Sequence, residues 1–296
     1  MKKWCLFLSL YFCVCLLAAC GAAPAATGPD PDAPAPDSGA PSLAEGETPV
    51  TLSLRIVDGA ETGNLLLAGE NAGDVYTLSI GDIPLTLNGD QAAVSADALE
   101  DGMLLDIAFN GMVMETFPAQ LGQIYAVTAW SQGTEKNPAG SYYDLCGLYL
   151  QVLEDLWETD AGLNSDDGLT YIGVDLSQAP GGLTEGEKAA IAWRFAENHG
   201  KSLVTGTWQE LVDQGYITGE SLDGSDAQFM HWEDGVLFSI TPADGHEDEA
   251  YSLPVLRFDA EKWRSSLGAY FFFDCSVTWP EMGTWTTYSV GSEAIS

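Results

Sequence analysis

The sequence predicts an α+β fold, in which a small all-β domain at residues 49–130 precedes helices packed on a mostly antiparallel, curved sheet at residues 141–296. Two observations carry this prediction. The first region consists of short stretches of alternating apolar and polar residues, with no helix-length periodic segment between them. The second region begins with helix-capping signals and continues as apolar strands. Residues 131–140 are the predicted linker.

The alternating stretches predict the strands of the first domain. Residues 52–56 and 76–80 both alternate between large apolar and polar side chains. Asn88-Gly89 and Asn110-Gly111 predict two-residue hairpin turns, because a type I′ turn requires positive φ at both central positions. The second turn would pair the strand before it with residues 113–115. Roughly five to seven strands in about 80 residues favour a small closed barrel or sandwich.

Capping residues place three helices in the second domain. Ser141 precedes a broad apolar stripe of helical period, which predicts a helix from residue 142 to about residue 158. Thr184 and Thr207 each have a glutamate three residues on, which is the capping-box pattern. These two helices are expected to end at Gly200 and Gly215. Strands are predicted at residues 169–176, 229–232, 236–240, 251–258, 269–279 and 285–290.

The first 48 residues predict export and a tether. Basic residues at positions 2 and 3 and an apolar run to Leu16 have the form of a secretory signal, predicted for residues 1–19. The run is shorter than the roughly 20 residues that cross a bilayer. Residues 20–48 are rich in alanine, proline, glycine and aspartate, so we expect a disordered tether there.

The segment Leu17-Ala18-Ala19-Cys20 resembles the lipobox of bacterial lipoproteins. This resemblance implies that Cys20 is acylated with palmitate-type chains and becomes the first residue of the mature chain. The lipid bilayer would then hold the protein at the extracytoplasmic face of the cell membrane. The alternative is an ordinary signal peptide that contains cysteines, since Cys5, Cys13 and Cys15 lie in the same stretch.

Longer segments are similar to uncharacterised surface lipoproteins of Gram-positive bacteria. Asp101-Gly102, Phe109-Asn110-Gly111 and residues 115–120 resemble the end of their small OB-like domains of unknown function. The resemblance implies an OB-like fold and no activity. The second domain resembles an α+β domain of the same lipoproteins, and it too brings no catalytic residues. Its similar segments are residues 171–176, 183–188, 206–211 and 262–269.

The charge of the chain argues against nucleic-acid partners. The sequence has 44 acidic and 10 basic residues, and removal of Lys2 and Lys3 with the signal leaves 8 basic residues and a charge of −36. Such a chain repels phosphate backbones and lacks the basic surface that binds them. The acidity is explained either by solubility or by attraction for cations and cationic peptides.

Three cations lie close together in a chain that has few of them. Arg257, Lys262 and Arg264 could form a clamp for a small anion or carboxylate. Alternatively, they pair with neighbouring acids such as Asp259 and Glu261.

An acidic loop offers oxygen ligands of the kind that calcium prefers. The candidate ligands are Asp244, Glu247, Asp248 and Glu249, although no EF-hand spacing is present and such runs are usually solvated.

Cys146 and Cys275 are the two remaining cysteines of the mature chain. They would form a disulfide outside the membrane or remain as two buried thiols.

Two function classes remain. The first is a non-catalytic, lipid-anchored module that binds a surface protein, peptide or carbohydrate ligand. The second is an extracytoplasmic enzyme that uses carboxylates such as Asp175 in the cup of the second domain, and a lesser alternative is an acidic binder of cations or cationic peptides. No cofactor is predicted. Two carboxyl groups that converge in a concave apolar pocket, at least one with a raised pKa, would favour the enzyme, whereas carboxylates spread over a convex surface would favour the binding module.

Overall fold

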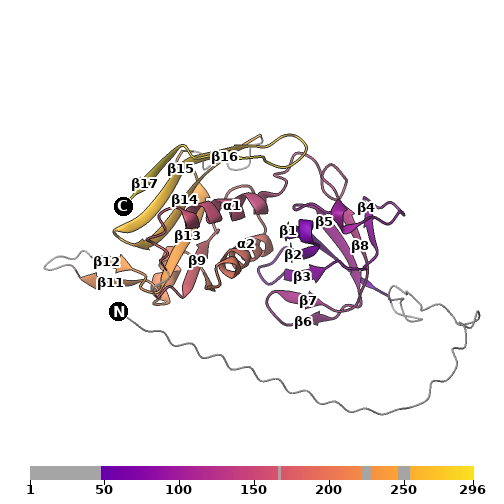
Figure 1. The fold of residues 1–296 in the computed structure, drawn as a ribbon, viewed down its shortest axis with the longest axis horizontal. Helices are drawn as coiled ribbons and strands as arrows, with labels where there is room; N and C mark the ends of the chain where they lie inside the picture. Colours follow the sequence, from indigo (N-terminus) through magenta and orange to yellow (C-terminus); the bar gives the residue numbers. More distant parts are fainter. Residues whose placement is uncertain (1–47, 166–167, 222–227, 246–253) are drawn as a thin grey trace, which may run out of the picture. The chain divides into compact units, whose positions relative to one another are not determined.

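The computed structural model describes residues 48–165, 168–221, 228–245 and 254–296. The predictions for the signal peptide, for Cys20 and for nearly all of the tether lie outside these residues. The described residues belong to one compact unit that is mostly β with few helices, which confirms the α+β fold class (Figure 1). Within the described part of the chain, no helix is both long and apolar enough to span a bilayer.

The first sheet has eight strands in the described residues, in the order β4-β8-β5-β1-β2-β3-β7-β6. Most neighbours are antiparallel, but β3 pairs with β7 and β4 pairs with β8 in parallel. Two short 3₁₀ helices, η1 (Ala60–Thr62) and η2 (Ala96–Ala98), lie in its connections. The strands are β1 (Val50–Asp58), β2 (Asn64–Ala68), β3 (Val75–Ser79), β4 (Leu85–Leu87), β5 (Leu104–Phe109), β6 (Val113–Met114), β7 (Ala119–Leu121) and β8 (Ile124–Trp130).

One of the two predicted hairpin turns is confirmed. Asn88 and Gly89 have φ values of 55° and 81°, and the chain turns back there, with residue 90 donating to the carbonyl of residue 87 at 2.9 Å. The hairpin predicted at Asn110-Gly111 is wrong. Both edges of β5 are already taken by β1 and β8, so β6 pairs with β7 instead.

The second sheet follows the first helix. Strands β9 and β10 are parallel neighbours joined through α2, and β13 is parallel to β9 on its other side. The remaining pairs are antiparallel. Its elements are α1 (Leu145–Glu158), β9 (Tyr171–Asp175), α2 (Glu185–Asn198), β10 (Ser202–Thr205), α3 (Trp208–Asp213), β11 (Thr218–Ser221), β12 (Gln228–His231), β13 (Gly235–Pro242), β14 (Val255–Ser265), β15 (Gly268–Thr278), β16 (Tyr288–Ser289) and β17 (Ser292–Ile295).

Two of the three predicted helix starts are confirmed. Thr184 and Thr207 are the N-caps of α2 and α3, and both capping boxes are complete. The start predicted at Ser141 is wrong, because the hydroxyl of Ser141 donates to a carbonyl upstream. Asp144 is the N-cap of α1 instead, and its carboxylate accepts from the backbone N–H of Gly147 at 3.1 Å.

Strands β1 and β2 are buried on both faces, which joins the first sheet to the helices. Alternate side chains such as Leu54 and Ile56 face a core inside the first sheet. Side chains of the opposite face, including Val57, Leu66 and Ala68, belong to the core that α1 and α2 form with the second sheet. The junction between the first sheet and α2 is therefore part of the main core.

Candidate functional site

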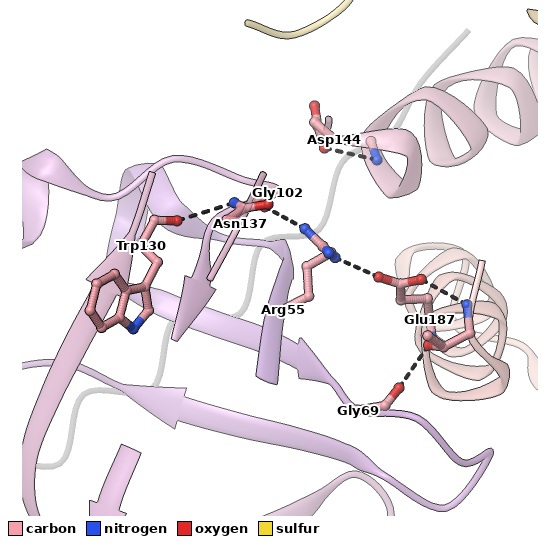
Figure 2. A network of polar contacts seen from close by, with 9 residues as sticks. Arg55, Gly69, Gly102, Trp130, Asn137, Asp144 and Glu187 are labelled. Atoms are coloured by element: carbon pink, nitrogen blue, oxygen red, sulfur yellow. Dashed lines mark hydrogen bonds and ion pairs between the residues drawn. The ribbon is translucent and has the colours of Figure 1, made fainter. Parts of the chain in front are cut away.

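A chain of polar contacts fixes this junction (Figure 2). Arg55 lies on β1, on the same face as the buried Val57, and points toward α2. Its Nε is 2.7 Å from Oε1 of Glu187, whose side chain is only 9% exposed. Its guanidinium also donates to the carbonyl of Gly102 at 2.8 Å, and the side chain of Asn137 links that carbonyl to the one of Trp130.

The first turn of α2 is bonded directly to the first sheet. The hydroxyl of Thr184 donates to the carbonyl of Gly69 at 2.7 Å, while Glu187 accepts from the backbone N–H of Thr184 at 2.8 Å. Gly186 permits this approach, because a Cβ at that position would lie 2.4 Å from the carbonyl oxygen of Gly69. The carboxylate of Glu187 therefore has two roles. One of its oxygens completes the capping box, and the other forms the ion pair with Arg55.

A groove of about 700 Å³ is lined by residues of β2, β3, β7 and the second half of α2. Its volume falls within the roughly 300–1,000 Å³ of small-molecule sites. Leu65, Leu78, Leu121 and Ile124 also border the groove, but they belong to or pack against the core inside the first sheet. Hydroxyl and amide side chains line the same groove: Thr62, Asn64, Thr77, Ser79 and Gln120.

The helical period of α2 supplies the wall of the groove. Ala190, Ile191 and Phe195 are fully buried in the core. Trp193 and Arg194 fall on the adjoining side of the helix, where both are partly buried and line the groove. The guanidinium of Arg194 lies 5.4 Å from the centre of the Trp193 ring, in a cation–π contact.

An ion pair separates this groove from a second cavity. Nε of Arg194 lies 2.7 Å from Oδ2 of Asp58, and both residues also line a cavity of about 210 Å³. We call this second space the side cavity. Asp101, Gln151, Glu154 and Asn198 complete its polar lining.

Two carboxylates of the side cavity have pKa values shifted in opposite directions. Burial raises the pKa of Asp101, although the N–H of Ala60 donates to it at 3.0 Å. Burial would also raise the pKa of Glu154, but hydrogen bonds from His199 and Asn198, both at 2.9 Å, lower it overall. Such a divided pair is the arrangement that acid–base catalysis uses.

Asp144, the N-cap of α1, adds a third perturbed carboxylate behind this cavity. Burial, followed by the negative charge of Asp101, raises its pKa to about 7, against the hydrogen bond from Gly147. Repulsion between the charges of Asp101 and Asp144 therefore favours protonation of one of these two carboxylates.

The three predicted cations do not form one site. Arg257 pairs with Asp274 at 2.7 Å, whereas Lys262 and Arg264 both bind the segment that follows α1. Arg264 donates to the carbonyls of residues 163 and 233 at 3.0 and 2.9 Å. The pairing partners proposed from the sequence, Asp259 and Glu261, are not the ones found among these contacts.

Lys262 is fully buried, and its ammonium group binds oxygen atoms of the chain. It donates to the carbonyls of Thr159 and Asp160 and, at 3.0 Å, to the side-chain oxygen of Asn164. Burial lowers its pKa to about 8. These contacts use its donors within the fold, and they give no support to an anion clamp.

The remaining candidates are separate from the junction. Asp244 is exposed, while Glu247, Asp248 and Glu249 lie outside the described residues. Elsewhere in the described part of the chain, no group of three or more His, Cys, Asp or Glu side chains is arranged to hold a metal ion. Asp175 lies at the end of β9 beside a cavity of about 190 Å³ and accepts from the N–H of residue 177.

Cys146 and Cys275 are both buried, and neither is in a disulfide. Burial raises the pKa of Cys275 to about 12 and that of Cys146 well above its usual range, so neither thiol is reactive at neutral pH.

Sequence reasoning missed the residues that form the junction. Asp58, Asp101 and Arg194 are far apart in the chain, and the packing of α2 on β1 and β2 brings them together. One signal was available: Leu65-Leu66-Leu67 is a continuous apolar run, which is typical of a strand covered on both faces. No family model, curated protein or solved structure matches this chain.

Proposed function

We propose that this protein is a lipid-anchored binding module of the extracytoplasmic cell surface, and that the groove beside Trp193 binds an oligosaccharide. The groove carries the proposal, because it combines the indole ring of Trp193 with five hydroxyl and amide side chains. The polar groups can exchange hydrogen bonds with sugar hydroxyls while the indole of Trp193 contacts the faces of the sugar rings. The anchor is the acylated Cys20 that the lipobox resemblance implies.

We infer an OB-like barrel from the strand pairing of the first sheet, and this inference supports the assignment. Strands β1, β2 and β3 form an antiparallel meander, and β5 pairs with β1. Only Gly122 and Gln123 separate β7 from β8, and these two strands pair with β3 and β5 respectively. A bent strand of this kind would close a five-stranded barrel. OB-folds bind oligonucleotides and oligosaccharides on strands two and three and on the loop between strands one and two.

The groove lies on the face that corresponds to this OB-fold binding surface. Its charge distinguishes between oligonucleotide and oligosaccharide ligands. It is lined by β2, by β3 and by the loop between β1 and β2, which includes Gly59 and Glu61. Arg194 is already paired with Asp58, so Glu61 adds a negative charge that no nearby cation offsets among the residues lining the groove. Together with the formal net charge of −34, this disfavours oligonucleotides and leaves a neutral or cationic glycan.

A binding assay tests the proposal directly. We expect immobilised protein to retain oligosaccharides from a digested bacterial cell envelope, and Trp193→Ala to weaken retention at least tenfold, which is about 1.4 kcal/mol. Trp208→Ala is the matched control, since this indole is 37% exposed on α3, away from the groove. Equal loss in both variants, or retention of peptides alone, would contradict the oligosaccharide site.

The divided carboxylate pair favours a second function, an acid–base hydrolase. Asp101 would serve as the proton donor and Glu154 as the base, beside the groove that holds the glycan. The same assay distinguishes the two functions. A hydrolase would release shorter fragments over time, and Asp101→Asn would stop this release while retention persists. A binding module returns the ligand unchanged.

A further inference from the structure

Exposed hydrophobic side chains gather on one edge of the first sheet. Five of the eleven large ones in the described residues lie there, each between 44% and 63% exposed. Apolar groups concentrated in this way usually mark an interaction surface. We call this surface the edge patch, and its members are Val50, Met112, Val113, Met114 and Phe117.

The edge patch is a consequence of strand order. Among the described residues, β6 is the last strand of the sheet and pairs only with β7, so no described strand lies along its outer edge. Val113 and Met114 point to opposite faces of β6, and both are exposed. A Cβ at Gly111 would lie 3.2 Å from Cγ2 of Val50, which places the start of β1 against the loop that leads into β6.

The predicted tether leads into β1, whose first residue, Val50, belongs to the edge patch. Residues 20–48 precede β1 directly, and a flexible coil of that length reaches roughly 30 Å from the acylated Cys20. Tethering gives the nearest surface of a protein the highest effective concentration at the anchor. The predicted tether ends two residues before Val50, a member of the edge patch.

We propose that the edge patch inserts into the interface of the lipid bilayer and orients the protein on the membrane. This inference rests on the lipid anchor of the proposed function. Methionine, valine and phenylalanine side chains can bury in the headgroup–acyl boundary at a favourable free energy. Residues 110–118 contain no lysine or arginine, so the contact is apolar, and the acidic protein is repelled by anionic headgroups. Added salt and neutral lipids both weaken this repulsion, so both should strengthen the contact between the edge patch and the bilayer.

Site-specific labelling tests this inference on the acylated full chain. Met114→Cys would carry a polarity-sensitive dye, and Leu267→Cys is the matched control, because Leu267 is 76% exposed in the turn between β14 and β15. The native Cys146 and Cys275 are buried and stay unlabelled in the folded protein. On vesicles of neutral lipid, we expect a blue shift and quenching by brominated lipid at position 114 only. Anionic lipid should reduce both signals, and added salt should restore them.

Co-flotation with vesicles reports the anchor separately from the contact. If the protein floats and the two labels respond alike, the anchor stands and the inference is overturned. A shift at position 114 that needs no vesicles and grows with protein concentration would assign the edge patch to a second copy of the chain. Failure to float together with unresponsive labels would overturn both the anchor and the contact.

Discussion

Replacing Asp144 with Asn should raise the free energy of unfolding at pH 8 by roughly 2–4 kcal/mol and have little effect at pH 4. Burial, followed by the charge of Asp101, raises the pKa of Asp144 to about 7 in the folded protein. In the unfolded chain this carboxyl has its ordinary pKa of about 3.9. Between these two values the folded state binds more protons, so stability falls as the pH rises through this range. Asn does not titrate, so Asp144→Asn removes this loss of stability at high pH.

Asn is a suitable replacement because it caps helices as well as Asp does and tolerates the left-handed backbone, with a φ of 58°, found at this position. Urea denaturation of both proteins from pH 4 to pH 8 provides the measurement. Asp90→Asn, in an exposed turn, controls for the general relief of a large negative charge. Parallel stability curves for wild type and Asp144→Asn would show that Asp144 is not perturbed in the fold.

Replacing Glu187 with Ala should destabilise the protein by about 2–3 kcal/mol. Loss of one partner from a buried ion pair costs roughly 3–5 kcal/mol, and partial exposure of Arg55 reduces that figure. The variant also removes the carboxylate that closes the capping box on Thr184. Glu185→Ala is the matched control, because Glu185 lies in the same turn but is exposed and forms a surface ion pair with Lys188.

A second variant at this position separates the two roles of the carboxylate. Glu187→Gln retains an oxygen that can accept from the N–H of Thr184, and it loses the charge that pairs with Arg55. We expect its stability to lie between those of wild type and Glu187→Ala. Thermal unfolding measures all three. If Glu187→Ala and Glu185→Ala were equally stable, the polar network of Figure 2 would not hold the junction.

Local signals made the capping boxes and one turn predictable. Thr184, Thr207 and Asn88-Gly89 each act through neighbours within three residues, so the sequence contains the whole interaction. Strand β14 was harder, because it continues seven residues beyond the predicted end at residue 258. Those residues are charged and aromatic, and the buried Lys262 among them depends on carbonyls about 100 residues away.

The failed predictions involve partners that are distant in the sequence. The alternation around Asn110-Gly111 correctly indicated strands, but it could not show that β5 was already paired on both edges. Ser141 is a good capping residue in isolation, and only the tertiary structure gives that role to Asp144. The junction is the same case, since Asp58, Asp101 and Arg194 have no common motif.

Hydrogen exchange on the intact protein tests the central claim most directly, namely that the groove between the first sheet and α2 is the ligand site. With the oligosaccharide that binds most tightly, we expect slowed exchange at residues 59–65, 77–79 and 120–124 and around Trp193. Exchange in α3 and in the turn between β14 and β15 should not change. Protection confined to the second sheet, with no change around Trp193, would contradict the account.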